Sequence, residues 1–185
     1  MRILKYISII LFTGILSIAC SSDDNGTPMA VNEEEVITTL AVTLTPDGGG
    51  TAITLQTRDL DGDGPNAPEI TVSGNLAAGV TYNGSIVLLN ETETPAEDIT
   101  KEVVAEAKEH QLFYTSGGGL EITTAYIDTD SDGNPLGTKF TLTAGNPSSG
   151  TLTFTLRHEP TKPNAGLSNA GGETDLEATF SVTVE

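Results

Sequence analysis

Hydrophobic and polar residues alternate along most of this chain, which is the pattern of a β-strand with one buried and one exposed face. Nine segments show this alternation or a short apolar run, and turn-forming Gly, Pro, Asn and Asp residues separate them. The predicted strands are 36–45, 51–58, 69–73, 82–90, 110–115, 120–127, 139–143, 151–158 and 176–184. About nine short strands with glycine-rich turns predict an all-β fold, an antiparallel β-sandwich, with a closed barrel as the alternative.

One segment has a helical period instead. The sequence Thr-Pro-Ala-Glu at 94–97 forms a capping box with proline at the first helical position. Ile99, Val103 and Ala107 then recur at the spacing of one helix face. We therefore expect a single amphipathic helix over 95–109.

The strand pattern occurs in two copies, offset by 69 residues. Residues 48–54 read Gly-Gly-Gly-Thr-Ala-Ile-Thr, and residues 117–123 read Gly-Gly-Gly-Leu-Glu-Ile-Thr. An aspartate-rich loop follows each of them, at 59–64 and at 128–133. Similarity at a fixed offset indicates an internal duplication of one β unit. The helix belongs to the first copy only, because its counterpart at 160–172 is rich in Gly, Asn and Pro and is expected to be a loop.

The N-terminal segment has the features of a bacterial export signal. A basic start with Arg2 and Lys5 precedes an apolar run over 6–18, which is shorter than the ~20 residues of a membrane-spanning helix. Cys20, the only cysteine, lies just after this run. A single cysteine cannot form a disulfide within the chain, whereas a bacterial lipoprotein needs one as its lipid-carrying N-terminus. We expect Cys20 to be lipidated, although Ser17 stands where such signals usually have leucine; a secretory signal with an incidental cysteine is the alternative.

The residues after the cysteine suggest where the chain is anchored. Ser-Ser-Asp-Asp-Asn at 21–25 resembles the lipoprotein export signal of Bacteroidota, in which acidic residues direct the protein to the outer leaflet of the outer membrane. The following polar stretch has the composition of a disordered tether. The expected organisation is a signal peptide at 1–19, a lipidated tether at 20–35 and a β-sandwich domain at 36–185.

The chain is strongly acidic, with 26 Asp and Glu against 8 Lys and Arg and a formal net charge of −18. This charge disfavours binding to nucleic acid and to anionic membrane surfaces, and it favours cations or basic partners. Solubility alone also explains it.

The two acidic loops carry candidate calcium ligands. Their aspartates are Asp59, Asp61, Asp63, Asp128, Asp130 and Asp132. The Asp-x-Asp-x-Asp-Gly pattern resembles the first half of an EF-hand loop, but the acid required at position twelve is replaced by Ile70 and Lys139. A complete EF-hand is therefore excluded, and bound Ca²⁺ would need a neighbouring ligand such as Glu69. The alternative is a pair of solvated turns, which Asp and Gly form readily.

The two histidines are candidate ligands of a transition metal. His110 and His158 each lie beside a glutamate, Glu109 and Glu159. Two imidazoles with a carboxylate suit Zn²⁺ or Cu²⁺, and two imidazoles alone could ligate haem iron. If each short connection reverses the chain, both histidines, both acidic loops and the tether fall at one end of the sandwich. The alternative is a pair of ordinary surface histidines.

Nothing in the sequence indicates nucleophilic catalysis. There is no Gly-x-Ser-x-Gly motif and no cysteine in the expected domain. We therefore expect a protein that is not an enzyme.

Four blocks, at 58–66, 109–114, 156–160 and 169–175, resemble a family of small flavobacterial-type surface-exposed outer-membrane lipoproteins, sometimes labelled type 1 periplasmic binding domain proteins. The resemblance implies a location on the outer membrane and a TonB-dependent receptor as partner. The label would imply a large doubly wound α/β fold, which this short, strand-rich chain does not fit.

These features together predict a non-enzymatic, cell-surface lipoprotein that binds a ligand, a metal ion or a metal complex, as accessory to a TonB-dependent receptor. The alternative is a structural or adhesive surface module stiffened by Ca²⁺.

Overall fold

The computed structural model describes residues 35–62 and 64–185. The signal peptide, Cys20, the tether up to residue 34 and Asp63 lie outside the described residues. None of the helices in the described part is long and apolar enough to cross a membrane.

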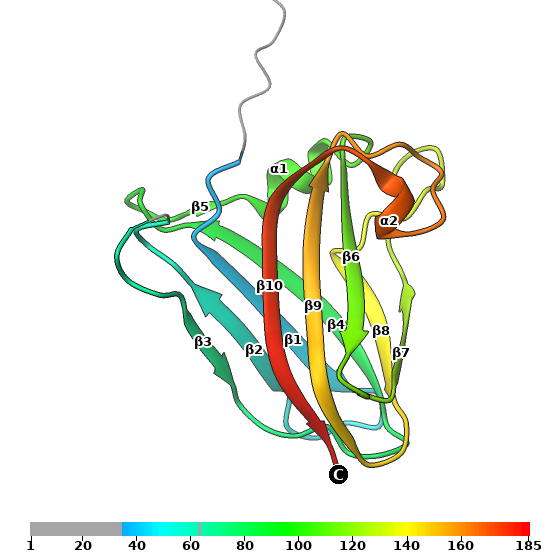
Figure 1. The fold of residues 1–185 in the computed structure, drawn as a ribbon. Coiled ribbons are helices and arrows are strands. Elements are labelled where there is room, and N and C mark those ends of the chain that lie inside the picture. Colours follow the sequence, from blue (N-terminus) through cyan, green and yellow to red (C-terminus); the bar gives the residue numbers. More distant parts are fainter. Residues whose placement is uncertain (1–34, 63) are drawn as a thin grey trace, which may run out of the picture. The chain divides into compact units, whose positions relative to one another are not determined.

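The described chain forms two antiparallel β-sheets (Figure 1). Its strands are β1 (Thr39–Pro46), β2 (Ile53–Arg58), β3 (Glu69–Val72), β4 (Thr81–Asn90), β5 (Glu97–Asp98), β6 (His110–Gly117), β7 (Ile122–Tyr126), β8 (Lys139–Ala144), β9 (Ser148–His158) and β10 (Glu173–Val184). The larger sheet has the order β3-β2-β1-β4-β8-β7, with β5 added to β4, and the smaller sheet has the order β10-β9-β6. The predicted all-β, sandwich-like fold is confirmed.

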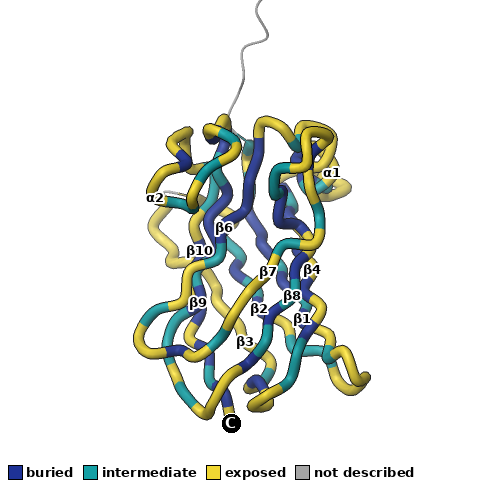
Figure 2. Tube along the Cα trace, turned by 90° about the vertical axis from the view of Figure 1, so that its right-hand side faces the viewer, coloured by how far each residue is buried: buried dark blue, intermediate teal, exposed yellow. Residues whose placement is uncertain are grey.

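The inner faces of both sheets share one hydrophobic core, as the burial pattern along the strands shows (Figure 2). In β4, every second residue is buried, including Ile86 and Leu88. The rings of Phe140, Phe154 and Phe180 come from both sheets and meet edge to face. Burying each such side chain contributes about 1.5–3 kcal/mol to stability. Burial of the apolar residues of the alternating pattern is therefore the main interaction that holds the two sheets together.

A glycine on the inner face of β4 makes room for one of these rings. A Cβ atom at Gly84 would overlap the ring of Phe140, its register partner on β8. The absent side chain therefore lets Phe140 stack on Tyr114 of the opposite sheet, with ring centroids 4.5 Å apart.

The predicted helix is shorter than expected. The helix α1 spans Thr100–Ala105 rather than 95–109. The chain before it is extended because β5 pairs with β4, so the expected capping box at 94–97 does not start a helix. After Ala105 the chain turns, and the N–H of Glu109 donates to the carbonyl of Glu106. The predicted spacing of the apolar face was right, since Ile99 and Val103 are buried.

The second repeat differs from its predicted form in one detail. The expected loop at 160–172 contains a one-turn helix, α2, at Leu167–Ala170. Its Ala170 is fully buried, and the carbonyl of this residue accepts a hydrogen bond from the N–H of Thr161. This hydrogen bond joins the start of the segment to its end, which leads into β10.

Equivalent strands of the two sequence copies form equivalent pairs. In the first copy β1 pairs with β4 and β2 with β3; in the second, β6 pairs with β9 and β7 with β8. The copies differ because β7 and β8 join the larger sheet through β4, while β6 and β9 form the smaller sheet with β10. The second copy is therefore divided between the two layers.

Candidate metal centre

The two histidines lie directly opposite each other at one end of the smaller sheet. His110 is the first residue of β6 and His158 is the last of β9, and they are register partners. Each histidine lies two residues from a fully buried leucine on its strand, Leu112 on β6 and Leu156 on β9. Side chains two residues apart lie on the same face of a strand, so both histidines face the core. The two imidazole rings stack with centroids 4.7 Å apart, and they are 0% and 4% exposed. The sequence prediction that the histidines share one end is confirmed.

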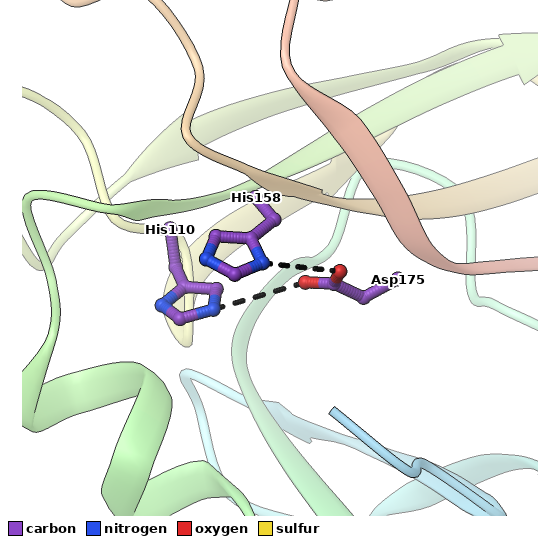
Figure 3. Close-up of side chains that lie close together, drawn as sticks. All are labelled: His110, His158 and Asp175. Atoms are coloured by element: carbon purple, nitrogen blue, oxygen red, sulfur yellow. Dashed lines mark ion pairs between the residues drawn. The ribbon is translucent and has the colours of Figure 1, made fainter. Parts of the chain in front are cut away.

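A carboxylate from the neighbouring strand faces both rings (Figure 3). Leu176 and Ala178 of β10 point toward the core, so regular alternation would send Asp175 outward. The register between β10 and β9 shifts between Thr174 and Leu176, which makes Asp175 the extra residue of a β-bulge. Bulges re-aim side chains, and here the side chain of Asp175 is 0% exposed.

The distances among these three groups match those of metal ligands better than those of hydrogen bonds. His110 Nε2 lies 3.7 Å from Asp175 Oδ2, and His158 Nδ1 lies 3.6 Å from Asp175 Oδ1. Hydrogen bonds between N–H and oxygen are about 2.7–3.2 Å long. Ligands bonded at ~2.1 Å to a tetrahedral zinc ion are ~3.4 Å apart. The three ligand atoms all lie within 4.8 Å of one another, which gives an N₂O set suited to Zn²⁺, Cu²⁺ or Fe²⁺.

His110 is held in the form that binds a metal. Its Nδ1 lies 3.3 Å from the carbonyl oxygen of Glu106, which can only accept, so Nδ1 carries the proton. The lone pair is then on Nε2, which faces Asp175 and makes no hydrogen bond among the described residues. Burial, aided by the neighbouring His158 and Lys162, lowers the pKa of His110. A neutral imidazole is the state that metal ligation requires.

A second group of candidate ligands shares His110. The ligand atoms of Glu35, Glu106 and His110 also lie within 4.8 Å of one another. Burial first, then a hydrogen bond with Glu102 and the charges of Glu102, Glu106 and Asp175, together raise the pKa of Glu35 to about 7. The carboxylates at this end therefore repel one another, and a divalent cation would relieve the repulsion.

A buried lysine fixes the start of β6. Lys162 Nζ donates to the carbonyls of Ala107 and His110, both at 2.6 Å, and lies 3.5 Å from Asp130 Oδ2. The Lys162 side chain is 6% exposed, and this burial lowers its pKa. The ammonium group thereby ties the 160–172 segment and the second acidic loop to the backbone of His110.

The aspartates of the second acidic loop bind their own loop. The carboxylate of Asp128 accepts the N–H groups of residues 137–138 at 2.9 and 3.0 Å, and also the hydroxyl of Thr138. Asp130 accepts the N–H of Asp132 and of Asn134, each at 2.9 Å. These bonds are those of a turn held by side chains.

The described aspartates of the first acidic loop also bind their own loop, whereas Asp132 pairs with a lysine outside its loop. Asp59 accepts the N–H of Asp61 at 3.3 Å, and Asp61 accepts the side-chain amide of Asn66 at 2.7 Å. Asp132 pairs with Lys108 at 2.9 Å. Among the described residues, no aspartate of either loop belongs to a group of three converging metal ligands.

The two glutamates next to the histidines do not take the expected position. Neither Glu109 nor Glu159 belongs to a converging group within the described chain. Their backbones are joined instead, since the N–H of Glu159 donates to the carbonyl of Glu109 at 2.6 Å. The carboxylate that faces both imidazoles belongs to Asp175, which the sequence analysis did not single out because only the bulge turns it inward.

Comparison with known proteins gives no relative from which a function could be transferred. No protein-family model, no curated protein and no solved structure matches the chain.

Proposed function

We propose that this protein binds a single divalent transition-metal ion, zinc in the first instance, through His110, His158 and Asp175. One observation carries the proposal: three segments distant in sequence bring two imidazole nitrogens and one carboxylate within 4.8 Å, with their side chains at most 5% exposed. Two imidazole nitrogens and one carboxylate oxygen form a donor set that first-row divalent metal ions prefer.

The geometry favours an ion over haem. Two axial histidines approach haem iron from opposite faces of a large flat ring, which would separate their imidazoles. His110 and His158 instead stack face to face at 4.7 Å with an interplanar angle of 21°. The nitrogen atoms on one edge of this stack face the same carboxylate, as the ligands of one small ion do.

The cellular role that we propose is capture of the ion at the cell surface, by a non-enzymatic lipoprotein that serves a TonB-dependent receptor of the outer membrane. The lipoprotein signal and Cys20 support this role, and so does the resemblance to flavobacterial outer-membrane lipoproteins. Glu35, at the boundary between the predicted tether and the domain, belongs to the same ligand cluster as His110. The alternative of a Ca²⁺-stiffened module gains no support from the described aspartates, which bind their own loops or, for Asp132, pair with Lys108.

The test is metal binding by the full chain with Cys20→Ser as background, so that the thiol does not contribute. After chelation, zinc at a hundred times its Kd should stabilise the protein by ~2.7 kcal/mol, an easily measured rise in melting temperature. His110→Ala, His158→Ala and Asp175→Asn should each abolish the rise. Glu177→Gln, an exposed neighbour on β10, is the control and should retain it. If zinc, copper and cobalt all fail to bind, or bind equally well to the histidine variants, the proposal is wrong.

A further inference from the structure

We infer that Glu35 and Glu106 form, together with His110, an outer position that receives the incoming cation and passes it to the buried site. This inference rests on the proposed function, because it describes how the same site is filled. Its basis is that two groups of three converging ligands share one histidine, and that they differ in their exposure to solvent.

The two carboxylates of the outer position are more exposed to solvent than the ligands of the buried site. His110, His158 and the side chain of Asp175 are buried. Glu35 is half-buried and Glu106 is exposed on the turn after α1. A hydrated cation can therefore reach the carboxylates of Glu35 and Glu106 before it reaches the inner ligands.

The two positions take the same ion in turn, because both groups include His110 and a neutral imidazole binds only one metal ion. His110 Nδ1 carries its proton toward the carbonyl of Glu106, so only Nε2 can bind a metal. Nε2 also faces Asp175, at 3.7 Å. An ion held at the outer position by Glu35 and Glu106 would move to the inner position by exchanging these carboxylates for His110 Nε2, His158 and Asp175.

The local charge favours this order of events. Glu102 on α1 places a third carboxyl group beside Glu35, and the nearby Lys162 ammonium donates to backbone carbonyls and to Asp130. Negative clefts raise the association rate of cations by ~10 to 10³-fold. The outer carboxylates are hard ligands, whereas the inner set has two imidazoles, which first-row transition metals prefer. The ion therefore binds first to the carboxylates of the outer position and then more tightly to the imidazoles of the buried site.

The experiment is a stopped-flow measurement with Co²⁺ on the full-length Cys20→Ser protein, followed by visible absorbance. Glu35→Gln and Glu106→Gln should each slow association by about tenfold or more. Glu109→Gln is the same substitution close by but lies outside both ligand groups, and it should change the rate far less. The difference between these variants should persist in high salt, which screens long-range steering.

The outcomes separate this inference from the proposed function. Association rates of Glu35→Gln and Glu106→Gln equal to that of Glu109→Gln would overturn the outer position while leaving the inner site intact. An unchanged association rate with faster dissociation would also overturn it, since the two carboxylates would then be permanent ligands. If wild-type protein binds no Co²⁺ at all, both proposals fall together.

Discussion

His110 and His158 occupy a single register position of the smaller sheet, opposite each other on β6 and β9, and both side chains point between the two sheets. Register partners of an antiparallel pair lie on the same face, which brings the rings into stacking contact. The site is thus set by strand pairing, which is among the most rigid relationships in the fold. Only the third ligand, Asp175, depends on an irregularity of its strand.

Asp175→Asn should separate metal affinity from folding. The amide keeps the shape of the side chain but removes the charge that a cation needs, so zinc affinity should fall by more than about 100-fold. The unliganded protein should be as stable as wild type or more stable, because the charge of Asp175 is one of those that repel Glu35. Calorimetric titration with zinc, together with melting in a chelator, measures both effects. A variant that is destabilised without metal but still binds zinc tightly would show that Asp175 has only a structural role.

Much of the fold follows from alternation alone. All nine predicted strands are present. Apolar residues at every second position, such as Ile86 on β4 and Phe180 on β10, lie on one face of their strand, and that face is the one that packs against the core. The same rule places the histidines, which extend the rows of Leu112 and Leu156. The sequence alone thus brings the two imidazoles together, once β6 and β9 are taken as partners.

The remaining features depend on contacts that no local pattern records. The helix begins late because Glu97–Asp98 pairs with β4, and this two-residue pairing outweighs a good capping box. Asp175 occupies a polar position in the alternating pattern of β10, so the sequence predicts that it faces outward, and only the bulge between Thr174 and Leu176 turns it inward. Glu35 could not be assigned to the site from sequence because it precedes the first strand and joins the site only through tertiary contacts.

Lys162→Met should weaken both the fold and the site. The ammonium donates two hydrogen bonds of 2.6 Å to the carbonyls of Ala107 and His110 and lies 3.5 Å from Asp130. Removing a charged donor from nearly buried partners should lower the free energy of unfolding by about 3 kcal/mol. Zinc affinity should fall as well, because the backbone of His110 is then free to shift.

The matched control for this substitution is Lys101→Met, whose side chain is 81% exposed and forms an ion pair with Asp98 of β5, just before the helix. Its free energy of unfolding should change by no more than about 0.5 kcal/mol. Urea unfolding measures both variants. Equal effects of the two substitutions would mean that the contacts of Lys162 contribute no more than those of a surface lysine.

Gly84→Ala should destabilise the sandwich without touching the site. The added methyl group would overlap the ring of Phe140, which packs against Tyr114 and Phe154 from the other sheet. Overfilling a packed core costs about 1–3 kcal/mol, so the melting temperature should fall while the affinity for zinc stays the same. Ser85→Ala, at the exposed neighbour on β4, is the control. A fully stable Gly84→Ala protein would contradict the observed packing of Phe140.

The ion pair between Arg58 and Glu91 should make the free energy of unfolding depend measurably on pH in the acid range. Arg58 donates two hydrogen bonds to Glu91 through Nε and Nη2, the shorter of them 2.6 Å, and the hydroxyl of Thr39 donates a third. These partners, Arg58 first, lower the pKa of Glu91 from 4.5 to about 2. A carboxyl group with a depressed pKa stabilises the folded state fully above its ordinary pKa of 4.5. That contribution is lost progressively as the pH falls toward 2.

Glu91→Gln should therefore be less stable than wild type at pH 6, and the gap should narrow steadily between pH 4.5 and pH 2. Urea unfolding across this range measures the gap, and Glu93→Gln, an exposed glutamate in the turn after β4, is the control. Glutamine keeps the size of the side chain but cannot hold the guanidinium through charge, so the pH-dependent part of the gap reports the ion pair itself. A gap that stays constant from pH 6 to pH 2 would mean that Glu91 acts through packing and neutral hydrogen bonds. In that case the start of β1 would be held to the end of β4 by the hydroxyl of Thr39 and not by the charge of Arg58.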